Sequence, residues 1–345
     1  MFSRKNWLKL SIGFLISAVC LFFALSGIDW AALSRIFLTV KIPFVLLFLL
    51  ILCLTVALRS LIYYRFLGRQ CRVSLPAIFE GLMIGYMVNS LFPLRAGDVA
   101  KAFLIGTMNR TSRTYTFTIV VIERLFDMIT LLIFFLVLLL QIGPGKHFTH
   151  AAAAVAVAVA LVLAFIAAVL GYTRLVLTTL DRLKPLFGEA PVEKIKCRIA
   201  TVKEGFTVLT SWRDVLFIQG IFLLIWGGYL AVNYVTGLAI GVNLGFAQTL
   251  SLIIAIALGS VIASTPGQLG VHQYACVLVF TTFGFTREEG LSFSLIQNSL
   301  SFAMPILLGW LFLLHANISL AQISQEKGLP KESADESAPS PLTET

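Results

Sequence analysis

Charged residues are scarce in this sequence. Asp, Glu, Lys and Arg make up 12% of the 345 residues, about half of the share that is usual in a soluble domain. Hydrophobic residues make up 58%. A soluble fold could not hide so much apolar surface, because a large part of any folded surface stays exposed. The composition therefore excludes a soluble enzyme or a disordered chain for most of the protein, and it indicates a polytopic membrane protein.

Cysteine and histidine are also few and scattered. The five cysteines have neither CxxC nor zinc spacing, and the four histidines show no metal-ligand pattern. The chain has no HExxH, GxSxG, Walker A or GxGxxG motif. We therefore expect no metal, no cofactor and no catalytic residues. The excess of 26 Lys and Arg over 17 Asp and Glu indicates membrane topology and not a nucleic-acid partner.

The apolar runs predict an all-α fold, a polytopic transmembrane helical bundle with about six full spans. Two further apolar segments, 76–108 and 245–285, are broken by Pro and Gly, and we predict that each is a re-entrant hairpin. The bundle would occupy residues 1–316, with a basic amphipathic connection at 173–213, and 317–345 would be a disordered cytoplasmic tail. The predicted spans are 8–28, 42–62, 114–140, 150–172, 214–239 and 291–314.

The distribution of positive charge predicts the topology, because Lys and Arg collect in cytoplasmic loops. With both broken segments returning to their own side, most Lys and Arg fall on the cytoplasmic side, in 59–72, 95–113 and 173–213. Arg59 and Lys101 are counted among these loop residues. If 76–92 were a full span, the basic segment 173–213 would lie on the outer side of the membrane, which the positive-inside rule disfavours. We therefore predict a multi-pass protein of the cytoplasmic (inner) membrane with both termini in the cytoplasm.

The two broken segments share a short motif. Pro-x-x-x-Gly occurs at Pro93 and Gly97 and again at Pro266 and Gly270, with Gly267 directly after the second proline. In the predicted topology the hairpins enter from opposite faces, which makes them an inverted repeat of the kind that many transporters contain. Alternatively, Pro and Gly mark the ends of two unrelated helices.

The strongest candidate site is the trio Glu123, Arg124 and Asp127. Their spacing of three and four residues allows all three to interact on one helix. At 1.5 Å per residue, Glu123 would lie about 15 Å into the span, near the bilayer centre. Charges at that depth normally face a partner or a wet cavity. The trio is either a structural ion cluster that locks the third span against a hairpin or a site where Arg124 meets an anionic lipid headgroup, and both can hold together.

The first broken segment offers a second candidate site. Asn89, Arg95, Asp98 and Lys101 surround the expected start of a helix. An arginine beside the free N–H groups of a helix amino terminus can bind phosphate. The alternative is an ordinary interfacial helix whose basic side chains lie in cytoplasmic water.

The second broken segment and the last span carry uncharged polar residues. Gln268 and His272 follow the second proline and could contact a headgroup, although a lone histidine is more often structural. Gln297 and Asn298 in the last span are expected to form interhelical hydrogen bonds. Together, the two segments would leave a wet, positively charged notch deep in the hydrocarbon.

Three stretches of sequence carry a family resemblance: NSLFPLRAGDVAKAFLIG, VVIERLFDMITLL and STPGQLGVHQYACVLVFTTFGF. Over 8–316 the chain resembles the lysylphosphatidylglycerol synthase transmembrane (flippase-like) family. The resemblance implies a lipid-handling membrane fold, which in multidomain members is associated with moving aminoacylated phosphatidylglycerol. The chain has Gly97-Asp98 where the family has Gly-Glu, and Gln268 where it has Gly. Because only about 30 residues follow 314, we do not expect the soluble synthase or glycosyltransferase domains of other members.

Two functional hypotheses follow. The first is a flippase or transporter for an anionic or glycosylated lipid, such as a polyprenyl-phosphate-linked or aminoacylated one. The second is a non-transporting scaffold, or accessory subunit, that docks a separate lipid-modifying enzyme or glycosyltransferase through 173–213 and the tail. A weaker third option is an intramembrane transferase with Glu123 or Asp127 as base. The sequence leaves the lipid and the oligomeric state open.

The predicted topology can be tested with two single cysteines in a cysteine-free background. Arg110→Cys and Lys196→Cys are both expected to react with a membrane-impermeant thiol reagent from the cytoplasmic side. Labelling from opposite sides would contradict the two-hairpin topology.

Overall fold

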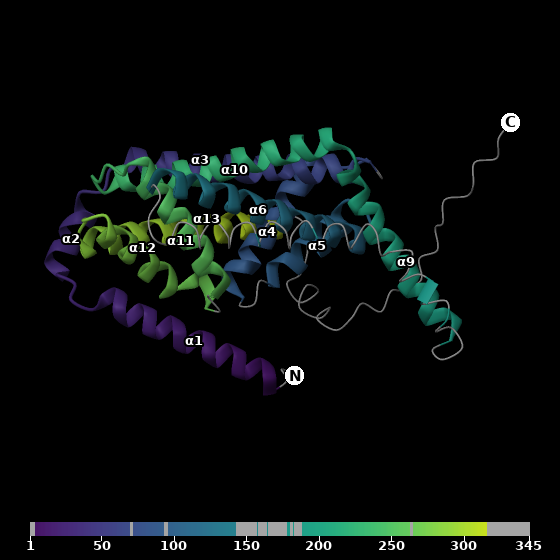
Figure 1. The fold of residues 1–345 in the computed structure, drawn as a ribbon, viewed down its shortest axis with the longest axis horizontal. Helices are drawn as coiled ribbons and strands as arrows, with labels where there is room; N and C mark the ends of the chain where they lie inside the picture. The colour runs from purple at the N-terminus through teal and green to yellow at the C-terminus, as the bar shows by residue number, and fades with distance from the viewer. Residues whose placement is uncertain are drawn as a thin grey trace.

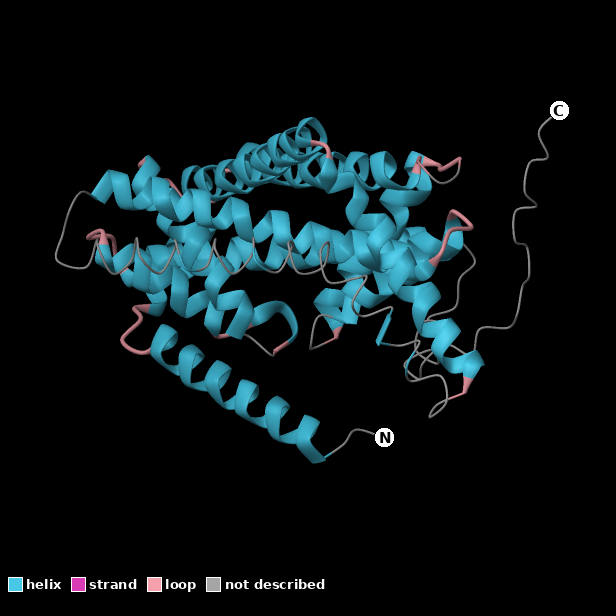
Figure 2. Ribbon diagram, turned by 45° about the vertical axis from the view of Figure 1, so that its right-hand side comes forward, coloured by secondary structure: helices cyan, strands magenta, loops and turns pink. Residues whose placement is uncertain are grey.

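The computed structural model is a bundle of α-helices, and the part of the chain that it describes contains no strand (Figures 1 and 2). It describes residues 4–69, 72–92, 96–142, 188–262 and 265–315, with a few isolated positions between 157 and 182. The predicted fourth span, 150–172, and the predicted tail, 317–345, lie outside the described residues. The helices are α1 (Arg4–Leu25), α2 (Trp30–Leu38), α3 (Ile42–Leu67), α4 (Leu75–Leu91), α5 (Ala96–Met108), α6 (Arg113–Ile142), α9 (Glu189–Phe206), η1 (Thr207–Thr210), α10 (Trp212–Ala239), α11 (Phe246–Ile262), η2 (Pro266–Gln268), α12 (Val271–Thr282) and α13 (Arg287–His315).

Helices α3 and α10 form an antiparallel pair along one edge of the bundle (Figure 1). At one end, the backbone N–H of Lys41 donates to the carbonyl of Ala239 at 3.0 Å. At the other end, Asp214 accepts hydrogen bonds from Arg65 at 3.0 Å and from Arg69 at 2.7 Å. Contacts at both ends fix the two long apolar helices side by side.

Among the described residues, three helices are long and apolar enough to cross a membrane: Ile42–Leu67, Trp212–Ala239 and Arg287–Leu314. The first apolar run was predicted to form one straight span over 8–28, and the structure differs from this prediction. Helix α1 ends at Leu25, and α2 turns away from it by 88°. The turn is stabilised by Asp29, whose carboxylate caps the free N–H groups at the start of α2. A helical membrane fold is thus confirmed, and the described part accounts for three spans, or four if the bent pair counts as one.

The first broken segment folds into two antiparallel helices, α4 and α5, which pack very closely. Gly85 lies against Lys101, and Gly97 lies against Asn89. A Cβ atom on Gly97 would come within 2.0 Å of the carbonyl oxygen of Gly85. The glycines are therefore required because the two backbones approach to a distance that leaves no room for a side chain.

The second broken segment, α11 and α12, also returns on itself. Gly259 lies against Val271 near the break. Further from the break, Leu252 and Phe280 share one core cluster. Gly270 has a φ of +89°, which L-residues rarely adopt, and it allows the chain to reverse direction. Both segments that were predicted to be hairpins are therefore antiparallel helix pairs.

Helix α13 contacts both hairpins. Near its start, Gly290 packs against Val277 and Phe280 of α12. Near its end, Gly309 packs against Met83 and Met87 of α4. The last helix therefore bridges the two hairpins, and its middle part lies between their tips.

Helix α9 forms within the segment that was predicted to be a basic amphipathic helix, and it projects from one end of the bundle (Figure 1). Val192 and Phe206 are buried, whereas Ile195 is 45% exposed. Gly205 packs against Thr118 near the start of α6. The end of α9 and the α5–α6 turn, which contains Arg110, therefore lie at the same end of the bundle, as the charge distribution predicts.

The close approach in the first hairpin can be tested by adding one methyl group. Gly97→Ala should lower the melting temperature in detergent by several degrees, because overpacking costs about 1–3 kcal/mol. Gly220→Ala in α10 is the matched control, since a Cβ there meets nothing within 4 Å. Equal melting temperatures for the two variants would contradict the close packing of α4 and α5.

Candidate functional site

Glu123 lies at the centre of a buried ion cluster. Its side chain is 1% exposed, and both of its carboxylate oxygens accept hydrogen bonds from Lys101 Nζ at 3.0 Å. Arg59 Nη1 donates to Oε1 at 2.5 Å, and the hydroxyl of Tyr63 donates to Oε2. These partners come from α3 and α5, so one carboxylate on α6 links a full-length helix to the first hairpin.

Asp127 extends the cluster by one helical turn. Arg59 donates to its two oxygens at 3.1 and 3.2 Å. The indole N–H of Trp226 donates to the same carboxylate at 3.0 Å, which brings α10 into contact with the cluster. Arg124 also approaches Asp127, at 3.4 Å. Asp127 therefore joins α3, α6 and α10.

Asp98 connects the cluster to the tip of the first hairpin. Arg124 binds it through two nitrogens, Nε at 3.2 Å and Nη2 at 2.6 Å. Asn89 donates to Asp98 at 3.4 Å and accepts a hydrogen bond from the backbone N–H of Gly97 at 2.8 Å. The predicted residues Asn89, Asp98, Glu123, Arg124 and Asp127 thus meet in one network.

The cluster is balanced in charge: three cations, Arg59, Lys101 and Arg124, face three carboxylates. Buried charges are tolerated only when they are paired and hydrogen-bonded, because removing them from water is costly. The cluster as a whole therefore carries no net charge among the described residues, and the positively charged notch stays a prediction. The alternative of an interfacial helix in water is wrong for Lys101, since its side chain is 0% exposed.

Arg59 is the main residue that the sequence analysis missed. It was counted as a cytoplasmic loop residue because Arg65, Arg69 and Arg72 follow it closely. In the structure it is buried within α3 and contacts carboxylates more than sixty residues away in the sequence. A local signal existed, since the predicted second span extends to residue 62 and includes Arg59.

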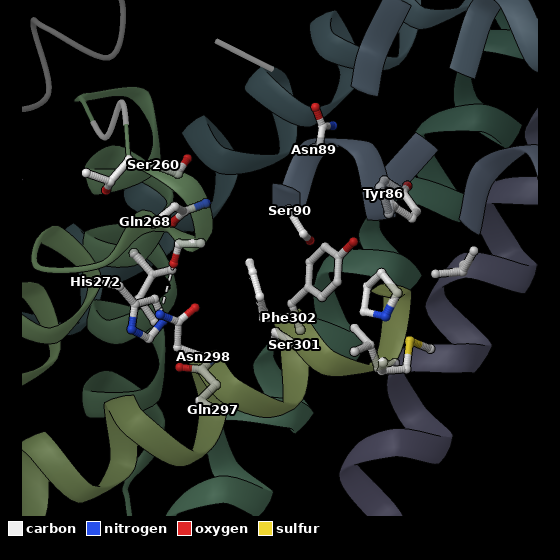
Figure 3. A pocket seen from close by; sticks show the side chains of 18 of the residues that line it. Tyr86, Asn89, Ser90, Ser260, Gln268, His272, Gln297, Asn298, Ser301 and Phe302 are labelled. Carbon is white, nitrogen blue, oxygen red and sulfur yellow. Dashed lines mark hydrogen bonds between the residues drawn. The ribbon is translucent and has the colours of Figure 1, made fainter. Parts of the chain in front are cut away.

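A cavity of about 420 Å³ lies between the tips of the two hairpins, beside the ion cluster (Figure 3). Helix α13 contributes one wall, and the rest comes from the two hairpins (α4, α11, η2 and α12) and from α3, α6 and α10. Uncharged polar side chains and apolar side chains share the lining, and among the described residues Arg124 is its one charged group. The lining residues are Leu52, Val56, Tyr86, Asn89, Ser90, Phe92, Arg124, Tyr229, Ile256, Ser260, Thr265, Gly267, Gln268, His272, Gln297, Asn298, Ser301, Phe302, Met304 and Pro305.

The polar residues of the second hairpin and of α13 meet at this cavity. Gln268 and His272 are both in its lining, as Figure 3 shows. Asn298 donates to the carbonyl of Gly267 at 2.9 Å, and Gln297 donates to Asn233 at 2.7 Å. The predicted interhelical hydrogen bonds of Gln297 and Asn298 are therefore confirmed.

Arg124 belongs to both the ion cluster and the cavity. Its side chain is 35% exposed, whereas Glu123 next to it is almost fully buried. The hydrogen bonds to Asp98 and Asp127 use three of the five N–H donors of a guanidinium. The remaining donors can serve a ligand in the cavity.

The predicted hinge residues have different outcomes. Pro93 and Arg95 lie outside the described residues. Pro266, Gly267 and Gly270 form the break between α11 and α12, as predicted. Within the described residues, no three His, Cys, Asp or Glu side chains are grouped so that they could hold a metal ion.

Comparisons with known proteins add a family relationship. Residues 10–309 match the family described as "Lysylphosphatidylglycerol synthase TM region". The chain is also similar to a UPF0104 membrane protein of Pyrococcus horikoshii, with 23% identity over 341 residues that cover 90% of this chain and 97% of the relative. No solved structure matches the chain significantly.

The contribution of the ion cluster to stability can be measured with two arginines, one within α3 and one just beyond its end. Arg59→Met should destabilise the protein by about 3–5 kcal/mol, because it leaves two buried carboxylates short of a partner. Arg69→Met removes an exposed pair with Asp214 and should cost about 1 kcal/mol or less. Thermal or denaturant unfolding in detergent measures both, and equal losses would show that the Arg59 pairs contribute no more than a surface ion pair.

Proposed function

The chain belongs to the lysylphosphatidylglycerol synthase TM region family of membrane proteins, and from this premise we propose that it is a lipid flippase. Its substrate would be an anionic or glycosylated lipid of the cell envelope. The observation that carries the proposal is the polar cavity between the tips of two broken-helix hairpins. Broken helices that meet at a shared site are the common substrate-binding arrangement of transporters.

The proposal assigns the headgroup to the cavity and leaves the acyl chains in the bilayer. Arg124 would donate its remaining N–H groups to a phosphate oxygen, while Asp98 and Asp127 hold the guanidinium in position. Asn89, Gln268 and His272 would contact the rest of the headgroup. Lys101 and Glu123 lie deeper, and their role would be to hold the first hairpin against α6.

The finer topology is part of the same proposal. We propose six full spans and two re-entrant hairpins, with both termini in the cytoplasm and the protein in the inner membrane. The basic residues at the ends of α3, α5 and α9 support this orientation, because they gather at one end of the bundle. The hairpins would then enter from opposite faces.

A scaffold role is the second candidate function, and helix α9 is the observation that favours it. The helix projects from the bundle and keeps Ile195 exposed beside basic residues. Such a surface could dock a lipid-modifying enzyme or a glycosyltransferase. The scaffold requires α9 and the tail but not Arg124, whereas the flippase requires Arg124.

Reconstituted liposomes test the flippase directly. Vesicles of phosphatidylcholine and phosphatidylglycerol would carry a fluorescent phosphatidylglycerol, a fluorescent polyprenyl-phosphate lipid or a fluorescent glycolipid, quenched from outside. Protein-containing vesicles should expose the inner-leaflet label faster than empty ones. Arg124→Gln should slow this by about tenfold or more, the loss expected for a hydrogen bond to a charged group.

Two controls make the result decisive. Arg69→Gln removes a surface ion pair far from the cavity and should flip lipid like the wild type. Arg124→Lys keeps the positive charge and should retain part of the activity if Arg124 binds the headgroup. Flipping no faster than in empty vesicles, across all three lipids, would count against the proposal.

A further inference from the structure

The lining of the cavity discriminates between kinds of headgroup. We propose that the site binds a polyhydroxyl headgroup with one phosphodiester charge, and not an aminoacylated headgroup that carries ammonium groups. This inference rests on the proposed function. A sugar or polyol phosphodiester lipid is the class that fits. Three observations support this: the charge of the lining, its hydrogen-bonding groups and its aromatic side chains.

The charge of the lining favours one negative charge and opposes positive ones. Arg124 is the one charged side chain that the described residues contribute to the cavity. An ammonium group would need a carboxylate, but Asp98 and Asp127 already accept hydrogen bonds from two or more side chains each. Glu123 is buried behind them. A cationic headgroup would therefore lie near the guanidinium and would find no carboxylate in the lining to pair with.

The uncharged groups of the lining suit hydroxyls, which can donate and accept. Gln297 lines the cavity and is 7% exposed, and its Oε1 lies near His272 without forming a hydrogen bond of normal geometry to it. Pro305 has no N–H, so the carbonyl of Ser301, one turn earlier, lacks its helical partner beside the same cavity. An acceptor as buried as Gln297 Oε1 is costly to leave unpaired. A hydroxyl donor from a sugar or polyol would satisfy both acceptors.

Aromatic side chains in the lining point the same way. Tyr86, Tyr229 and Phe302 provide apolar faces on which the C–H groups of a sugar ring can pack. An ammonium could also bind to an aromatic face. The ring of Tyr86, however, already lies 5.4 Å from Lys101 Nζ, so its negative face is occupied by a cation of the protein itself.

Native mass spectrometry of the purified full-length protein in detergent tests the inference. The probes are phosphatidylinositol, lysylphosphatidylglycerol and phosphatidylcholine with identical acyl chains. Phosphatidylinositol should be retained at least several-fold better than either of the others. Water-soluble glycerophosphoinositol should compete only weakly, which would identify a lipid and not a free sugar phosphate as the ligand. Equal or tighter binding of lysylphosphatidylglycerol, or full displacement by the soluble compound, would overturn the proposal.

Variants connect the selectivity to the cavity. Gln297→Leu, which nearly keeps the size of the side chain, and Gln268→Ala, which removes it, should reduce the preference for phosphatidylinositol, with little effect on phosphatidylcholine. The matched control is Gln219→Leu, because Gln219 donates a hydrogen bond to Thr130 at 2.8 Å outside the cavity. If both cavity variants kept the wild-type preference, the inference would be wrong.

The binding test and the liposome test fail independently. Selective binding of phosphatidylinositol without any flipping would keep this inference and overturn the flippase. Flipping of any of the three liposome probes, together with unselective binding of phosphatidylinositol and lysylphosphatidylglycerol, would keep the flippase and overturn the inference.

Discussion

The pairing of buried charges around Glu123 is the constraint on which the rest of the structure depends. A carboxylate deep in an apolar bundle must be paired and hydrogen-bonded, because its desolvation is costly. Arg59 on α3 and Lys101 on α5 provide that pairing from two different helices. Arg124 and Trp226 bind the neighbouring carboxylates. The position of the first hairpin against α3, α6 and α10 is therefore fixed by electrostatics as well as by packing.

The cavity is a consequence of that fixed hairpin. The close packing of Gly85 and Gly97 keeps α4 and α5 together, and Asn89 ties the tip of the hairpin to Asp98. On the other side, Asn298 of α13 holds the turn of the second hairpin through Gly267. The two tips face each other across a polar cavity. On the side of the first hairpin, the cations and carboxylates of the ion cluster balance one another. Such a site can recognise a headgroup mainly by hydrogen bonds, and Arg124 is the one cation that can bind a phosphate.

Much of this arrangement could be predicted from the sequence, because it depends on local spacing. The spacing of Glu123, Arg124 and Asp127 places them on one helix, and the two Pro-x-x-x-Gly motifs predict the two breaks. The role of Arg59 could not be predicted, since its partners lie on α6 and only tertiary packing brings them together. The charge balance of the ion cluster could not be predicted for the same reason, because it depends on which helices meet. The 88° turn between α1 and α2 was also missed, because the apolar run continues through Leu25.

The central claim is that the space between the hairpin tips is an aqueous site that a lipid headgroup can enter. Cysteine reactivity on α13, in a cysteine-free background, measures this most directly. Ser301→Cys lines the cavity, whereas Ser292→Cys on the same helix is fully buried. The account predicts that a hydrophilic thiol reagent modifies the first cysteine and not the second, and that added phosphatidylinositol slows the reaction. An unreactive Ser301→Cys, or one that reacts at the same rate with and without lipid, would contradict the account.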